Sequence, residues 1–157
     1  MCTVNPKIDI IFRKLFGSEE NKDILLSLIN AVVEWETPIQ EIIIKNPYNF
    51  QDYIRSKASI VDIKGVDEKG RWYDIELQVG EQGFYGRRAL FYLCKLFASQ
   101  LESGDTYSKL MPTIGIHFLD FEYFPDEKRY RRRCVILDEE TKEKYNELEY
   151  LDLYFIE

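Results

Sequence analysis

The sequence predicts an α/β domain in which helices flank a mixed central β-sheet. Three observations predict this fold class. Two early segments and one central segment carry apolar residues at helical spacing, several later segments alternate in polarity as strands do, and residues 60–80 join two such strands by a polar turn. The length of 157 residues suits one domain with its own hydrophobic core, so residues 1–157 are treated as a single domain.

Three helices are predicted, and the first two lie near the amino terminus. Residues 7–16 carry apolar side chains at helical spacing, and Gly17 ends that helix. Ser18 is the expected N-cap of the second helix, which continues to about Glu36. The third helix covers residues 84–101. Its apolar stripe consists of Phe84, Leu90, Phe91, Cys94, Phe97 and Leu101.

The strands are predicted from alternating or continuously apolar runs. In chain order they cover residues 39–44, 60–66, 72–79, 112–121, 129–138 and 148–157. The chain therefore stops at a strand, with no closing helix after it. From this we expect that a carboxyl-terminal portion of the domain is missing from the sequence.

Composition limits the classes of protein to which this chain can belong. A hydrophobic share of 45% and an aromatic share of 15% argue against disorder, and no apolar run reaches the ~18 residues that span a bilayer. The net charge of −7 argues against bulk coating of nucleic acid, although carboxylates that hold metal ions add to such a count. Cys2, Cys94 and Cys134 are scattered, so we expect small apolar side chains in a reducing, cytoplasmic setting.

The hairpin of residues 60–80 carries charged residues inside its strands. Alternation places an apolar set on one face, consisting of Val61, Ile63, Tyr73, Ile75, Leu77 and Val79. The other face carries Asp62, Lys64, Asp74, Glu76 and Gln78. If residues 67–70 form the turn, Asp62 and Glu76 meet across the two strands. The plainer interpretation is a solvated outer face. Against it, this face also carries Ile60, Val66 and Trp72.

Two neighbouring carboxylates favour a hard cation with oxygen ligands, of which Mg²⁺ is the typical case. A lysine or glutamine beside them can orient an attacking water. Together these groups are typical of metal-assisted hydrolysis, in which the ion generates hydroxide and stabilises charge on phosphate oxygens.

The segment "VDIKGVDEKGRWYDIELQ" resembles the catalytic hairpin of PD-(D/E)XK nucleases, and more closely that of the recombination-promoting nuclease and putative transposase family. The resemblance extends to "DIIFRKLFG", "ENKDILLSLINAVV", "RRALFYLCKLFASQL" and "DTYSKLMPTIGIHFLDF", and it covers most of residues 5–121. It implies a restriction-endonuclease-like core and DNA cleavage that depends on Mg²⁺ or Mn²⁺.

By position in the motif, the resemblance implies that Asp62 and Glu76 bind metal and that the Leu77 carbonyl is a further ligand. Gln78 stands where the superfamily most often has lysine, and glutamine cannot supply positive charge. We infer that Lys64, two residues after Asp62 on the same strand face, compensates for this change. The alternative is that Lys64 only pairs with a neighbouring carboxylate.

Two residues outside the hairpin are weighed against plainer roles. In many of these nucleases an acid on an early helix completes the metal site, which makes Glu20 a candidate ligand. An acid in the first turn of a helix also complements the helix dipole. His117 is the sole histidine and has no second histidine or cysteine nearby, so we expect a structural role for it.

Candidate DNA contacts lie on the third helix and in one basic run. Steps of three and four residues along the helix align Tyr85, Arg88, Tyr92, Lys95 and Ser99. Arg87 lies beside this stripe, and Gln100 belongs to the "QL" segment of the resemblance. The alternative is a solvated helix face. The run "KRYRRR", residues 128–133, is either a phosphate contact or a charged edge strand.

The function that these observations favour is a Mg²⁺-dependent DNA endonuclease of the recombination-promoting type. The alternative is a degenerate nuclease fold that binds DNA or protein without catalysis, which the glutamine at position 78 favours. A third interpretation, a plain interaction domain, predicts that Asp62 and Glu76 lie far apart and solvated. We expect DNA as the partner and no membrane, and we leave a homodimer open.

Overall fold

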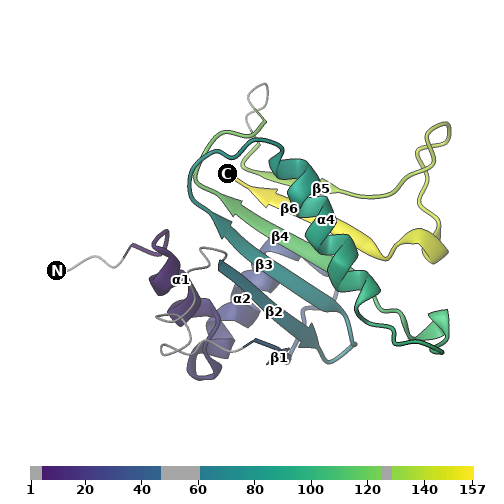
Figure 1. Cartoon of the computed structure of the whole chain (residues 1–157), viewed down its shortest axis with the longest axis horizontal. Helices are drawn as coiled ribbons and strands as arrows, with labels where there is room; N and C mark the ends of the chain where they lie inside the picture. Colours follow the sequence, from purple (N-terminus) through teal and green to yellow (C-terminus); the bar gives the residue numbers. More distant parts are fainter. Residues whose placement is uncertain (1–4, 47–60, 125–128) are drawn as a thin grey trace.

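The protein folds around one six-stranded mixed β-sheet (Figure 1). The structure, a computed structural model, describes residues 5–46, 61–124 and 129–157. Its strands are β1 (Ile42–Ile44), β2 (Val61–Asp67), β3 (Trp72–Gln78), β4 (Thr113–Leu119), β5 (Arg131–Cys134) and β6 (Leu151–Ile156). They lie in the order β1-β2-β3-β4-β6-β5. Strands β3, β4 and β6 run parallel, while β1–β2–β3 and β5–β6 pair antiparallel. The predicted mixed sheet is therefore confirmed.

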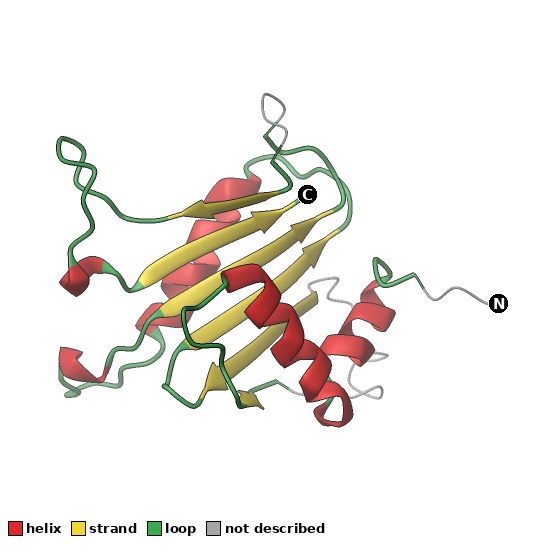
Figure 2. Ribbon diagram, turned by 180° about the vertical axis from the view of Figure 1, so that it is seen from behind, coloured by secondary structure: helices red, strands yellow, loops and turns green. Residues whose placement is uncertain are grey.

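Helices cover both faces of this sheet. The amino-terminal α1 (Asp9–Phe16) and α2 (Lys22–Val33) lie on one face, and α4 (Tyr85–Ala98) lies on the other (Figures 1 and 2). Short 3₁₀ helices occur at η1 (Glu19–Asn21), η2 (Tyr107–Lys109) and η3 (Asn146–Leu148). This arrangement confirms the expected α/β class, and it means that neither face of the central strands is open to solvent.

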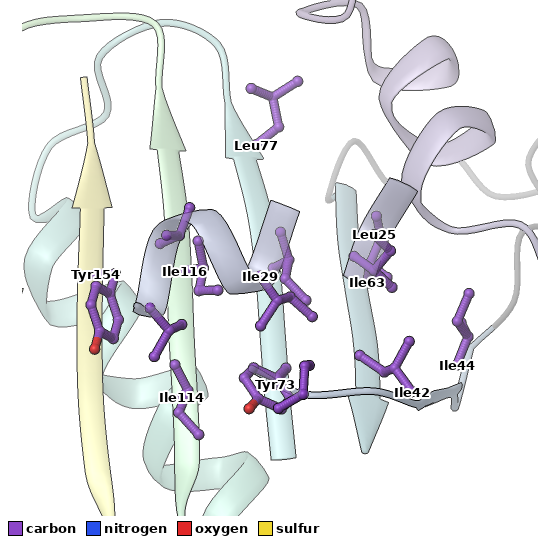
Figure 3. Packing of buried hydrophobic residues seen from close by; sticks show 14 of the residues in the cluster. Leu25, Ile29, Ile42, Ile44, Ile63, Tyr73, Leu77, Ile114, Ile116 and Tyr154 are labelled. Atoms are coloured by element: carbon purple, nitrogen blue, oxygen red, sulfur yellow. The ribbon is translucent and has the colours of Figure 1, made fainter. Parts of the chain in front are cut away.

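The main core lies between α2 and the sheet (Figure 3). Leu25 and Ile29 of α2 are fully buried among side chains from the apolar face of the hairpin and from β4. The strand residues in this cluster include Ile63, Tyr73, Ile75, Leu77, Ile114 and Ile116. Burying one such side chain stabilises a fold by roughly 1.5–3 kcal/mol, so this layer fixes the register of the hairpin.

Several predicted boundaries differ from the structure. The Ser18 hydroxyl donates a hydrogen bond to the Lys14 carbonyl, 2.8 Å away, and α2 begins only at Lys22. That helix ends at Val33 because Glu34 adopts a left-handed conformation, with φ 55°. Helix α4 ends at Ala98, three residues earlier than predicted. The predicted strand residue 60 lies outside the described residues.

The two cysteines that the structure describes lie at the surface. Cys94 and Cys134 are free and exposed, because Cys94 lies on the outer side of α4 and Cys134 ends the edge strand β5. Cys2 lies outside the described residues. Within the residues that the structure describes, no helix combines the length and the hydropathy that a membrane crossing requires.

Candidate functional site

The two strands of the hairpin bring the predicted site residues together. Strands β2 and β3 pair so that Asp62 lies directly opposite Glu76 and Lys64 opposite Asp74. Gln78 follows on the same face at the end of β3. The register depends on the turn at residues 68–71, where Gly70 takes φ 80°, a conformation that glycine adopts without strain. The predicted turn and the predicted proximity of the two carboxylates are confirmed.

This polar face is buried on β3 rather than solvated. Glu76 is 3% exposed and Asp74 4% exposed. On this face of the sheet, α4 packs with a second hydrophobic cluster, whose buried members are Tyr85, Ala89, Leu119 and Phe155. The solvated-face interpretation is therefore wrong for β3. The plain interaction domain also fails on this point, since it predicts carboxylates that lie far apart in solvent. Asp62 on β2 is only partly covered, with a quarter of its side chain exposed.

Asp62 is held by two cations. Its Oδ1 lies 3.4 Å from the Arg13 guanidinium of α1, and its Oδ2 lies 3.1 Å from Lys64 Nζ. Asn46, just after β1, bridges the same strand: its side-chain amide donates to the Asp62 carbonyl at 3.1 Å and accepts from the Lys64 amide at 2.6 Å. The carboxylate is thus held by two cations and its backbone by Asn46, while a quarter of the side chain remains exposed.

Glu76 is enclosed by a different set of groups. Arg88 of α4 donates through Nη2 to Glu76 Oε1 at 2.8 Å. His117 of β4 places Nδ1 3.5 Å from Glu76 Oε2 and 3.0 Å from the Tyr85 hydroxyl. Since Glu76, Tyr85 and His117 are almost completely buried, their mutual contacts hold the carboxylate in one orientation. The structural role that we expected for His117 therefore includes a specific contact with Glu76.

Asp74 is the least compensated carboxylate of the site. Its Oδ1 is buried and has no hydrogen-bond partner among the described residues. Burial raises the pKa of Asp74 to about 6, while the Lys64 charge opposes this rise and the Asp62 charge adds to it. A buried oxygen without a donor is expensive in a low-dielectric setting, so this atom marks an incomplete environment.

We expect Asp74→Asn to stabilise the metal-free protein at neutral pH. A folded-state pKa of about 6 in place of 3.8 means that the folded protein binds the proton more tightly than the unfolded chain. The resulting penalty is absent below about pH 4, grows between pH 4 and 6, and is complete above pH 6 at roughly 3 kcal/mol. Urea unfolding in EDTA at pH 4.5 and 7.5 measures it, and the variant should gain stability mainly at pH 7.5.

Asp105→Asn is the control, because its effect on the free energy of unfolding should have the opposite sign. A hydrogen bond from Lys109 lowers the pKa of Asp105, so its contribution is present at neutral pH and lost on acidification. If Asp74→Asn has the same urea midpoint as the parent at both pH values, the proposed penalty is wrong.

Lys64 remains a cation in this environment. Burial lowers the pKa of its ammonium group, but the hydrogen bond and charge of Asp62, together with the charge of Asp74, outweigh burial. The net pKa is raised above the ordinary value of 10.5. Lys64 can therefore supply positive charge at neutral pH, and it cannot serve as a general base there.

The other predicted metal and water ligands occupy different settings. Gln78 is buried, and its side-chain amide donates to the Gly80 carbonyl at 3.2 Å. Leu77 points its side chain into the core, while its backbone pairs with both β2 and β4. Glu20 is exposed in η1. Among the described residues, no three His, Cys, Asp or Glu side chains lie close enough to hold one metal ion together, so Glu20 does not join Asp62 and Glu76 here.

The side of helix α4 that we expected to face DNA is partly turned toward the sheet. The stripe that we expected at the DNA points partly inward, because Tyr85 is buried on His117 and Arg88 reaches Glu76. Tyr92 is half-buried, with its ring centroid 5.7 Å from the Arg88 guanidinium. Arg87 and Lys95 are exposed on the helix and available to a partner.

Gln100 and the basic run make structural contacts away from the catalytic hairpin that the sequence predicts. The Gln100 amide group donates to Met111 and Thr113 and accepts from the Met111 amide, at 2.8–3.1 Å, and so anchors the start of β4. Residues 131–133 of the basic run belong to the edge strand β5. Arg131 donates to the Val32 carbonyl at 2.6 Å, and Arg133 pairs with an aspartate of β6 at 2.8 Å. These contacts favour the edge-strand interpretation.

A family model for PD-(D/E)XK nuclease family transposases matches residues 6–157, which is nearly the whole chain. The chain belongs to this family. Neither a curated protein nor a solved structure matches it. Family membership supports a nuclease-type function.

The donor set fits a divalent metal ion, which PD-(D/E)XK nucleases generally use. Asp62 and Glu76 offer hard oxygen ligands at paired positions, and the unpartnered Asp74 oxygen lies on the same face. Both carboxylates also have cationic side chains as partners: Arg13 and Lys64 contact Asp62, and Arg88 contacts Glu76. The kind of ligand fits, although the two carboxylates also have partners that a metal ion would have to replace.

Sequence reasoning missed three residues that shape the site. Arg13 and Asn46 approach the hairpin from segments remote in sequence, and no spacing rule connects them with Asp62. His117 was discounted because it has no second histidine nearby in sequence. Its position on β4 directly opposite Glu76, in a parallel pair, became visible only with the sheet order.

Proposed function

We propose that this protein is a DNA endonuclease that depends on Mg²⁺ or Mn²⁺, of the recombination-promoting type. The observation that carries the proposal is the register that sets Asp62 opposite Glu76 on a face covered by α4, with Gln78 two residues further on. Family membership supports the same class of reaction. The covered face provides the low-dielectric setting in which charged groups act most strongly on a phosphodiester.

The proposed metal ligands are Asp62, Glu76 and the Leu77 carbonyl. When bound, the ion would supply an activated water and stabilise negative charge on the phosphate. Asp74 lies on the same face, opposite Lys64, and we assign to it an electrostatic role beside the metal ligands, since no three such side chains among the described residues lie close enough to hold one ion. His117 and Arg88 then act on Glu76 by fixing the direction of its oxygens.

Lys64 and Gln78 are the groups that we assign to the water and the phosphate. The Gln78 amide has no charge but can orient a water through its oxygen. Lys64 carries the positive charge that the usual lysine of the superfamily would supply, and its pKa keeps it protonated. The two side chains thus divide between them the orienting and the electrostatic tasks of one residue.

Lys64→Ala should lower the rate of plasmid nicking on the order of 10²-fold, the usual effect of removing one well-placed donor to a developing charge. Lys69→Ala is the matched control, because Lys69 is exposed in the turn of the same hairpin. Gln78→Lys in the Lys64→Ala background should restore part of the rate if Lys64 compensates for the glutamine. Parent-level nicking by Lys64→Ala would remove Lys64 from the mechanism.

DNA would approach across α4. This helix contains Arg87, Arg88 and Lys95 and no acidic residue, in a chain whose net charge is −7. Arg87, Tyr92 and Lys95 are the proposed phosphate and sugar contacts, since Arg88 is engaged by Glu76. Such contacts position the backbone and are independent of base sequence.

A degenerate, purely binding protein is the second candidate function. The observation that favours it is the pairing of both carboxylates with arginine or lysine, which satisfies their charge without a metal ion. The decisive experiment is nicking of supercoiled plasmid by the parent protein in Mg²⁺ and in EDTA. Mg²⁺-dependent nicking supports the nuclease, while DNA binding without nicking in Mg²⁺ or Mn²⁺ supports the binding protein.

A further inference from the structure

Phe84, in the connection between β3 and α4, combines strain with exposure. Its backbone takes φ 64° and ψ 26°, the left-handed region that bulky side chains rarely adopt. Its side chain is nevertheless 75% exposed, so no burial offsets this conformation. Strain of this kind persists where the surrounding structure enforces it, and it is frequent at functional positions.

The Phe84 backbone adjoins the network that leads to Glu76, because its carbonyl accepts a hydrogen bond from the Arg88 amide at 3.2 Å. Gln82, two residues earlier, accepts a hydrogen bond from Arg88 Nη1 at 2.7 Å, and Arg88 Nη2 contacts Glu76 at 2.8 Å. Arg87 places its guanidinium carbon 4.9 Å from the Phe84 ring centroid and braces the ring. Phe84 is therefore a solvent-facing aromatic residue at the start of the helix turn that carries Arg88 to Glu76.

The outer side of α4 is apolar and basic at once. The stripe that we expected to define the helix core, including Phe84, Leu90, Phe91 and Cys94, faces solvent. The buried side instead carries Tyr85, Ala89, Leu93 and Leu96. Two basic residues, Arg87 and Lys95, are exposed on the helix, which has no acidic residue, so the charge of this side complements a polyanion and opposes the packing of a second copy of α4 against it. A polyanion with flat apolar surfaces is nucleic acid with accessible bases.

We propose that Phe84 stacks on an unpaired base of DNA bound along α4, while Arg87 contacts the adjacent phosphate. Bases in an intact duplex present no free face, so the site would prefer DNA with unpaired nucleotides, such as single strands, gaps or flaps. This inference rests on the proposed function and specifies its substrate class. Arg87 is suited to both neighbours, since a guanidinium stacks on aromatic rings and pairs with phosphate.

The test is binding of fluorescein-labelled DNA in EDTA, where cleavage does not occur. The probes are a single strand of about 16 thymidines and a duplex of equal length. The parent should bind the single strand more tightly. Phe84→Leu and Phe84→Gly should each weaken that binding about tenfold, with less than a twofold effect on the duplex. Tyr107→Leu, which removes an exposed aromatic ring in η2, is the control and should match the parent.

Phe84→Gly also separates binding from folding. Glycine adopts the left-handed conformation freely, so the thermal midpoint of this variant should equal or exceed that of the parent while its affinity for the single strand falls. Unchanged single-strand affinity in both variants, or an equal loss on the duplex, would overturn the stacking role and leave the nuclease proposal standing. A parent that binds no DNA would overturn both, and a Phe84-dependent change in oligomeric state without a change in DNA affinity would assign the surface to protein contacts.

Discussion

Asp62→Asn is expected to abolish Mg²⁺-dependent nicking of supercoiled plasmid, with a loss on the order of 10³-fold. Losing one charged ligand removes several kcal/mol of metal binding and charge stabilisation, and each 1.36 kcal/mol corresponds to a factor of ten in rate. Asn keeps the size of the side chain and removes its charge. Since a quarter of the Asp62 side chain is exposed and its ion pairs are partly solvated, the folded state should lose no more than about 1 kcal/mol.

Two measurements make this prediction specific. Isothermal titration with Mn²⁺ should show binding to the parent and much weaker binding to Asp62→Asn, which reports on the metal site independently of activity. Asp152→Asn is the matched control, because Asp152 is also a strand carboxylate in an ion pair with an arginine, but on β6. If Asp62→Asn nicks DNA as the parent does, the catalytic assignment is wrong. If the parent neither nicks DNA nor binds Mn²⁺, the degenerate fold is the better description.

Much of the fold could be predicted because local patterns carry it. Alternation over the hairpin, together with a turn that Asp67 closes by accepting hydrogen bonds from the Lys69 and Arg71 amides, determines the register. Once the register is known, the opposition of Asp62 and Glu76 follows. The helix ends were less predictable. The residue that ends α2 in a left-handed conformation is Glu34, whereas glycine is the residue that usually marks such an end in a sequence.

The orientation of α4 could not be predicted, because helical spacing reveals an apolar stripe and not the direction that it faces. Tyr85 and Arg88 turn inward since their partners, His117 and Glu76, come from strands and are themselves buried. The apolar stripe is left outside as a consequence. In the same way, Arg13 reaches Asp62 across 49 residues of sequence, a distance over which no local pattern operates.

Arg88→Met should destabilise the protein by roughly 3–5 kcal/mol at neutral pH, the usual cost of leaving a buried carboxylate without its cation. Glu76 has only 4% of its side chain exposed, and Arg88 provides its shortest contact, at 2.8 Å. Urea unfolding followed by circular dichroism at neutral pH measures this free energy.

The controls for Arg88 distinguish support of Glu76 from contact with DNA. Arg87→Met alters the neighbouring arginine, which contacts the exposed Phe84 ring, and it should change the free energy of unfolding by less than about 0.5 kcal/mol. The double variant Glu76→Gln/Arg88→Met removes the charge together with its partner and should recover most of the stability. If Arg88→Met instead weakens DNA binding and leaves stability unchanged, Arg88 is free to bind phosphate, as the helical stripe in the sequence suggested. The structure favours the first outcome because Arg88 is held by both Gln82 and Glu76 before any DNA arrives.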